Sequence, residues 1–239
     1  MSLSGKLLKR GKWFKPNLKL IQKKMVELQK KKKRWWKPRD GRNVVRFLPA
    51  ASKSGMWYFD LAFHYGPGLP CLAGVSKRGC PVCKLHQKLL NSSSTSKLKM
   101  AKDIAPQTRV LFNIVDLTDD SSKDRGVQVY AHSETTLSKL MAFWNDAEWG
   151  DFTDPDEGYD IIIEKTNEKG PNAFKIRPRR NPSKLAKMSW LKNMKKLSKV
   201  HKIPTYVEAK RRLYEWRTGD AGVGRFKKEA EKVQNRYED

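Results

Sequence analysis

The sequence predicts a mainly β protein with helical additions. We expect an OB-fold-like Greek-key barrel with a small cysteine-bearing subdomain, flanked by basic N-terminal and C-terminal helical segments. Three observations lead to this fold class: apolar residues alternate in the middle of the chain, all three cysteines lie close together, and positive charge is concentrated toward the two ends. With 239 residues, the chain can bury one sizeable core.

The strands are predicted from a two-residue hydrophobic period that begins at residue 43. Their predicted ranges are 43–48, 57–64, 108–116, 127–131, 159–165 and 173–178. A helix is predicted at 134–145. Five or six short strands with one inserted helix fit a partly open Greek-key barrel of the OB type, and a β-sandwich gives similar signals.

The strand at 57–64 has one apolar face, which we expect to lie in the core. That face consists of Trp57, Phe59, Leu61 and Phe63. Tyr58 and His64 fall on the opposite face, where a ligand at the end of the strand can be reached. The serine-rich residues 91–107 are predicted to form a mobile polar loop that carries Lys97, Lys99 and Lys102.

The cysteines have the spacing of a metal site. Cys71, Cys80 and Cys83 fall within thirteen residues, and the last two form a Cys-Pro-Val-Cys knuckle. Such a knuckle points two thiolates at one ion, and a structural zinc takes four nitrogen or sulfur donors. A disulfide would leave one thiol over, so we predict one structural Zn²⁺.

Two histidines are candidates for the fourth ligand. His64 lies upstream at the end of a predicted strand, whereas His86 follows Cys83 on a predicted helix with Val82, Leu85 and Leu89 on one face. We favour His64, because a ligand on a strand lets the ion join two separate elements. His86 would connect only positions on its own helix.

The net charge of +26 predicts a polyanionic partner, of which nucleic acid is the usual one. Residues 1–42 contain 16 basic and 2 acidic side chains, residues 43–183 contain 19 and 16, and residues 184–239 contain 16 and 7. The middle of the chain is therefore nearly neutral. A membrane partner is not expected, since the aromatic residues are spread along the chain and no cysteine stands where a lipid anchor would.

Both ends are predicted to contain helices. Residues 17–33 have an amphipathic pattern and lead into a lysine run followed by Trp35 and Trp36, which we expect to stack on nucleotides. Near the other end, Leu185 to Leu197 predict one helix. Thr205 and Glu208 form a capping box for a second, ending near Gly219, and a third is predicted at 225–237.

The predicted domains are a basic arm at 1–40, a barrel at 41–183 and a basic helical segment at 184–239. The zinc subdomain occupies residues 64–90 within the barrel. A nucleobase deaminase, the enzyme alternative, requires Glu two residues after the histidine and Pro before the cysteine pair. Gly66 and Gly79 stand there instead, so we predict a protein without enzymatic activity.

Binding to any DNA sequence requires cations for phosphates and aromatic faces for bases. The predicted contacts are Arg46, Tyr58, Lys97, Lys99, Lys102, Arg109, Phe112, Tyr130, Phe174 and Arg177. The alternation predicts that Tyr58 and Tyr130 point outward. For Phe112 and Phe174 the core is the better prediction, because isoleucines follow them in phase.

Several of these segments together resemble a known family. They are the stretch from Gly41 to Pro49, His64 on its apolar strand, Cys71, the Cys80–Cys83 knuckle, and Phe112-Asn113-Ile114-Val115-Asp116. In this order they resemble the zinc-containing single-stranded DNA-binding proteins of the T-even bacteriophages. The resemblance covers roughly residues 40–218.

The resemblance implies an OB-fold core with zinc held by His64, Cys71, Cys80 and Cys83. It also implies sequence-tolerant binding of single-stranded DNA, self-association along the strand, duplex destabilisation, and work with replication, recombination or repair proteins. The expected location is the cytoplasm of an infected bacterial host. The alternative is a structural protein that packages RNA or duplex DNA on a zinc-stabilised OB scaffold.

Overall fold

The computed structural model describes residues 17–22, 24–25, 35–51, 55–168 and 170–219. Contacts within the chain divide it into two units, residues 1–34 and residues 35–239. In the first unit, residues 18–22 and 24–25 are helical, as predicted for this part of 17–33. The rest of that helix, and the helix predicted at 225–237, lie outside the described residues.

The second unit is built on a mostly antiparallel sheet of eight strands in the described residues. The strands are β1 (Trp35–Trp36), β2 (Gly41–Phe47), β3 (Tyr58–His64), β4 (Leu69–Pro70), β5 (Pro106–Asp116), β6 (Val127–Ser133), β7 (Ile161–Lys165) and β8 (Phe174–Pro178). The main order is β1-β6-β5-β2-β7-β8, and β3 pairs with both β4 and β5. All six predicted strands are present, and the predicted fold class is confirmed.

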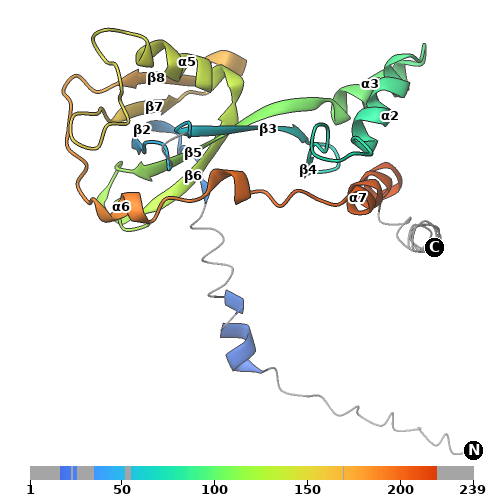
Figure 1. Ribbon diagram of the computed structural model, residues 1–239, viewed down its shortest axis with the longest axis horizontal. Helices are drawn as coiled ribbons and strands as arrows, with labels where there is room; N and C mark the ends of the chain where they lie inside the picture. The colour runs from blue at the N-terminus through green and yellow to red at the C-terminus, as the bar shows by residue number, and fades with distance from the viewer. Residues whose placement is uncertain (1–16, 23, 26–34, 52–54, 169, 220–239) are drawn as a thin grey trace, which may run out of the picture. The chain divides into compact units, whose positions relative to one another are not determined.

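The helices in the described residues of this unit are α2 (Pro81–Leu90), α3 (Thr95–Ile104), α4 (Asp120–Lys123), α5 (Glu134–Trp144), α6 (Ser189–Lys192) and α7 (Tyr206–Thr218), with 3-10 turns η1 (Gly170–Ala173) and η2 (Leu197–Lys199). The helix α5 lies beside β7 and β8, whereas α2, α3 and α7 group near β4 at the end of β3 (Figure 1). The helix α5 was predicted. The predicted start of α7 is confirmed: the Thr205 side chain accepts a hydrogen bond from the Glu208 N–H, as expected for the capping box.

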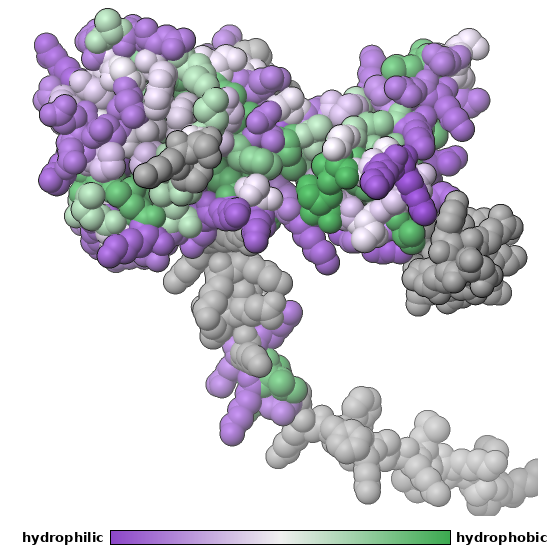
Figure 2. All heavy atoms as spheres, viewed as in Figure 1, coloured by the Kyte–Doolittle hydropathy of each residue, from purple (hydrophilic) through white to green (hydrophobic). Residues whose placement is uncertain are grey.

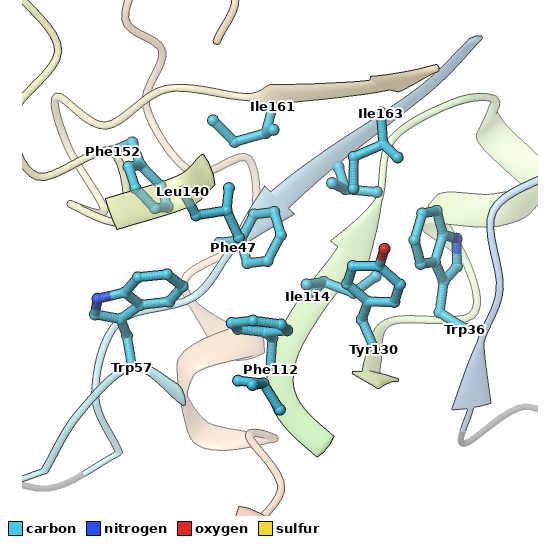
Figure 3. Packing of buried hydrophobic residues seen from close by; sticks show 12 residues of the cluster. Trp36, Phe47, Trp57, Phe112, Ile114, Tyr130, Leu140, Phe152, Ile161 and Ile163 are labelled. Atoms are coloured by element: carbon cyan, nitrogen blue, oxygen red, sulfur yellow. The ribbon is translucent and has the colours of Figure 1, made fainter. Parts of the chain in front are cut away.

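The barrel core is dominated by aromatic rings from several strands. Phe47 lies at its centre and contacts Phe112, Trp57 and Phe152 edge-on, with ring centroids 5.3–6.1 Å apart. Figure 3 shows these rings pointing toward one another. Edge-to-face contacts of this kind add to the free energy gained by burying the rings.

Trp36 belongs to this core and not to a nucleotide-binding surface. Its side chain is only 4% exposed. The indole Nε1 donates a hydrogen bond to the Asp116 carboxylate over 2.9 Å, and β1 pairs in parallel with β6. Trp36 is therefore buried in the sheet. The prediction that Trp36 stacks on nucleotides is wrong.

A second, smaller core joins β4, α2, α3 and α7. We call this part the metal module. Leu69, Val82 and Ile104 are fully buried in it, and Ala209 and Leu213 of α7 pack against them. The predicted loop at 91–107 is therefore wrong: α3 occupies most of it, because Ala101 and Ile104 bury one helical face in the module.

Residues 184–205, which we call the C-terminal strap, connect the barrel to α7 (Figure 1). The single helix predicted for Leu185 to Leu197 is wrong, since only the short α6 and η2 interrupt an irregular chain. Leu185 and Trp190 pack on the barrel beside Val115. The apolar side chains thus anchor an irregular segment and do not form one helical face.

The predicted alternation of residues 57–64 is only partly confirmed: Trp57 is buried in the barrel core as predicted, whereas Asp60 and Ala62 on the Tyr58 face are exposed. Tyr58 pairs with Phe112 and packs against the barrel core. Phe59, Leu61 and Phe63 lie on the other face and are only half-buried. The core prediction is therefore confirmed for Trp57 and wrong for Phe59, Leu61 and Phe63, because at these positions the core residues Val110 and Phe112 of β5 lie on the side that carries Tyr58.

Arg46 is a charged residue inside the barrel. It is 1% exposed, and its Nη1 lies 3.2 Å from Asp160 Oδ1 and 3.2 Å from the Ser183 hydroxyl. The carbonyl oxygen of Ser183 accepts another hydrogen bond from it. Burial lowers the pKa of Arg46, while Asp160 and Asp154 oppose that shift. Arg46 therefore ties β2 to Ser183, the residue just before the strap.

Replacing the buried anion should destabilise the barrel strongly. We expect Asp160→Asn to lower the free energy of unfolding by about 3–5 kcal/mol, because it leaves Arg46 buried without its counterion. The control is Arg179→Ala, which removes the half-exposed second cation 3.4 Å from Asp160 and should cost less than about 1 kcal/mol. Urea unfolding measures both, and equal losses would contradict this role of Asp160.

Candidate metal centre and nucleic-acid interface

Four potential ligands converge in the metal module. His64 ends β3, Cys71 follows β4, Cys80 caps the N-terminus of α2, and Cys83 lies in its first turn. Their ligand atoms all lie within 4.8 Å of one another. A hairpin and the start of a helix therefore bring together four residues from three separate elements of one short segment.

The spacing of these atoms fits one tetrahedral ion. Bonds of about 2.3 Å to sulfur and about 2.0–2.1 Å to nitrogen place two sulfurs about 3.8 Å apart, and sulfur and nitrogen about 3.6 Å apart. Cys71 and Cys83 have their sulfurs 3.4 Å apart. The His64 Nε2 atom lies 3.5 Å from the Cys80 sulfur and 3.6 Å from that of Cys83. The cluster can hold one metal ion.

The His64 ring is oriented for metal binding by the backbone of α3. Its Nδ1 lies 2.7 Å from the Ile104 carbonyl oxygen. A carbonyl only accepts, so Nδ1 carries the proton and the Nε2 lone pair faces the cysteines. A backbone carbonyl commonly fixes a ligand histidine in this way.

The cysteine environments favour thiolate at one position above all. Burial alone would raise the pKa of Cys80, but His64 and the backbone N–H groups of Leu72, Cys83 and Val82 lower it to about 6. Burial raises the pKa values of Cys71 and Cys83. A bound cation offsets that cost, because thiolate is the metal-binding form.

His86 takes no part in this cluster. It lies on α2, half-exposed, and does not belong to the group of four ligand atoms. The preference for His64 over His86 therefore agrees with the geometry. The four donors come from β3, the segment after β4, and α2. They would fill all four positions of a four-coordinate ion and leave no open position for a reacting water.

Next to the metal module, aromatic rings and an arginine form a continuous surface on the outer side of β3 and β5. We define this aromatic–arginine surface as Trp35, Phe63, Tyr65, Arg109 and His201. His201 of the strap lies between Phe63 and Trp35, with ring centroids 5.4 and 5.3 Å away. Figure 2 shows hydrophobic side chains along the course of β3, bordered by hydrophilic ones.

Arg109 is held on this surface by three contacts. Its Nη1 donates a hydrogen bond to the Tyr65 hydroxyl over 2.7 Å. The guanidinium carbon lies 5.9 Å from the centre of the Phe63 ring and 5.5 Å from that of Tyr65. Tyr65 itself is 47% exposed. A fixed cation beside open aromatic faces suits both a phosphate and a stacked base.

A hollow of about 400 Å³ opens between β3 and the strap. We call it the β3 hollow. Its walls include Met56, Trp57, Tyr58, Phe59, Lys195 and Lys196. Its lining thus combines apolar and aromatic side chains with two lysines.

The structure separates the predicted DNA contacts into exposed and buried residues. Lys97, Lys99 and Lys102 are exposed on α3, and Arg177 is exposed on β8. Tyr58 and Phe174 are half-buried against the barrel core. Phe174 also packs edge-on against the His132 ring, 4.6 Å away.

Three predicted contacts are buried in the core and offer no surface to DNA. Arg46, Phe112 and Tyr130 are at most 1% exposed. The prediction that Tyr130 points outward is wrong, because it pairs with Phe112 on the inner face of the curled sheet. Burial raises the pKa of Tyr130 above its ordinary value.

Trp35 and Arg109 of the aromatic–arginine surface were predicted as contacts, whereas its other three members, Phe63, Tyr65 and His201, were not. Phe63 was assigned to the core, and Tyr65 and His201 lie just outside the predicted elements. Their only sequence signal is their position at a strand end and in the basic C-terminal segment. The strap brings His201 to β3 from 138 residues away in the sequence.

Comparison with known proteins gives one family. The family described as "gp32 DNA binding protein like" matches residues 39–215. A search of curated proteins found no match. Within the described residues, none of the helices has the length and apolar character needed to cross a membrane.

Removing the histidine ligand should abolish metal binding, whereas the nearby histidine should be dispensable. We expect His64→Ala to lose the bound metal, because three donors and an open position replace a closed site. His86→Ala, the matched control, should keep one ion per chain. Elemental analysis of protein purified without chelator measures both, and a metal-free His86→Ala with a loaded His64→Ala would reverse the assignment.

Proposed function

We propose, from the premise that this chain belongs to the gp32-like DNA-binding protein family, that it binds single-stranded DNA with little regard to sequence. The aromatic–arginine surface carries this proposal. It offers the Tyr65 ring and the Arg109 guanidinium side by side, held by a hydrogen bond of 2.7 Å. Every base has a π-face, so stacking tolerates any sequence.

The positive charge supports binding to the phosphate backbone. The helix α3 presents three exposed lysines, Lys97, Lys99 and Lys102. Two more, Lys195 and Lys196, border the β3 hollow. We propose that phosphates contact these cations while bases stack on Tyr65 and Phe63. Tyr58, Phe174 and Arg177 remain proposed secondary contacts.

We further propose that the bound metal is zinc and that its role is structural. Three thiolates and one imidazole form a donor set typical of structural zinc. When bound, the ion would join the end of β3 to α2. In this proposal the protein is not an enzyme. It coats single strands through self-association, and it destabilises duplexes during phage DNA replication, recombination and repair. Its proposed setting is the cytoplasm of an infected bacterium.

Single-stranded DNA should bind far more tightly than duplex of the same length. Measuring affinity for poly-dT and for a duplex across a salt series tests this. We expect a clear preference for poly-dT that weakens as salt increases, because phosphate contacts release counterions. Equal affinity for both substrates, or a preference for structured RNA, would favour a packaging protein instead.

The exposed Tyr65 side chain should contribute to DNA binding. We expect Tyr65→Ala to weaken poly-dT binding by about 1–3 kcal/mol, the value of one stacked base. Val75→Ala, also exposed in the metal module, is the control and should bind normally. Fluorescence anisotropy measures both, and unchanged binding by Tyr65→Ala would remove this residue from the interface.

A further inference from the structure

A second hollow borders the strap, shares Lys195 with the β3 hollow and has a strongly basic lining. It has a volume of about 310 Å³, and we call it the basic hollow. Its walls come from the turn before β6 and from the strap around α6. They include Lys123, Asp124, Arg125, Lys187, Trp190 and Lys195.

Most of its cations have no acidic partner. Among the described residues, no carboxylate lies within ion-pair distance of Arg125, Lys187 or Lys195. Lys123 pairs with the exposed Asp120 over 2.9 Å. Asp124 is the single carboxylate of the lining as described. The hollow is therefore a concentration of uncompensated positive charge, which attracts anions.

The protein holds this lining in place. Trp190 is 5% exposed and packs with Val127 and Leu48 under the strap. The side-chain amide of Asn113, itself buried on β5, forms two hydrogen bonds to the backbone of Lys195, 3.0 and 2.9 Å long. The sheet thus fixes the backbone at Lys195.

Lys195 connects the two hollows, because it lines both. The β3 hollow has Trp57, Tyr58 and Phe59 in its walls, whereas the basic hollow has only the buried Trp190. Ser189 and Asn193 add polar groups to the basic hollow. Its chemistry therefore fits phosphate groups and offers no open ring for a base.

We propose that the basic hollow binds phosphodiester groups of the same single strand that lies on the aromatic–arginine surface. The strand would leave the β3 hollow, cross Lys195 and continue along Arg125 and Lys187. The binding site is then longer than the aromatic–arginine surface alone. At its far end, the protein contacts only the sugar–phosphate backbone of the DNA. This inference rests on the proposed binding of single-stranded DNA.

The test is the double variant Arg125→Ala/Lys187→Ala, which keeps Lys195 because it lines both hollows. Its affinity is measured for oligo-dT of about 6 and about 16 nucleotides, lengths within the range of one OB fold. The control variant, Lys88→Ala/Lys184→Ala, loses the same charge at exposed positions outside both hollows. Thermal unfolding confirms that both variants are folded.

We expect the double variant to bind the long oligomer about 25-fold more weakly at about 0.1 M salt, with the salt slope reduced by about 1.4, as for two lost phosphate contacts on a single strand. The double variant should bind the short oligomer with the same affinity as the unchanged protein does. Affinity for the long oligomer equal to that of the control would overturn the proposal, as would an equal loss on both lengths. If the unchanged protein binds neither oligomer, the proposed function itself fails.

Discussion

The pairing of β3 with β5 is the constraint on which the rest of the structure depends. Its register runs from Tyr58 opposite Phe112 to His64 opposite Pro106. One end therefore lies in the barrel core and the other in the metal cluster, while Arg109 stands opposite Leu61 between them. A slip of β3 by one residue would turn Tyr58 away from the core and His64 away from the cysteines, whereas β5 is held in place by β2 and β6. The two cores thus specify the same register.

The metal module depends on long-range contacts because its own apolar core is small. The His64 ring links β3 to α3 through the Ile104 carbonyl, and α7 covers the module from far along the chain. At Gly66, a Cβ atom would lie 2.9 Å from the Trp216 ring and 3.0 Å from the Asp103 carbonyl oxygen. The α7 helix therefore docks directly on backbone at the end of β3. Metal binding adds folding free energy where little apolar surface is available.

The sequence allowed prediction of the strands, of α5 and of the four grouped ligands, because each has a local pattern. The faces of β3 could not be predicted in this way, since alternation shows that two faces differ but not which one the sheet encloses. Residues 91–107 are polar enough to resemble a loop, and only the packing of Ala101 and Ile104 against distant residues makes them helical. The same holds for the candidate DNA contacts: the curl of the sheet buries Tyr130, and the strap brings His201 to Phe63.

Arginines in this protein show how the surroundings decide the role of a charge. Arg46 is enclosed, and its terminal guanidinium nitrogens pair with Asp160 and the oxygen atoms of Ser183, so it acts within the barrel. Arg109 instead donates to a neutral hydroxyl and lies against two rings, which orient its charge without neutralising it. The net charge of +26 acts at long range and attracts any polyanion. Under the proposed function, discrimination for single strands would come from places where an uncompensated cation stands beside an open aromatic face, because a duplex offers phosphates but keeps its bases stacked.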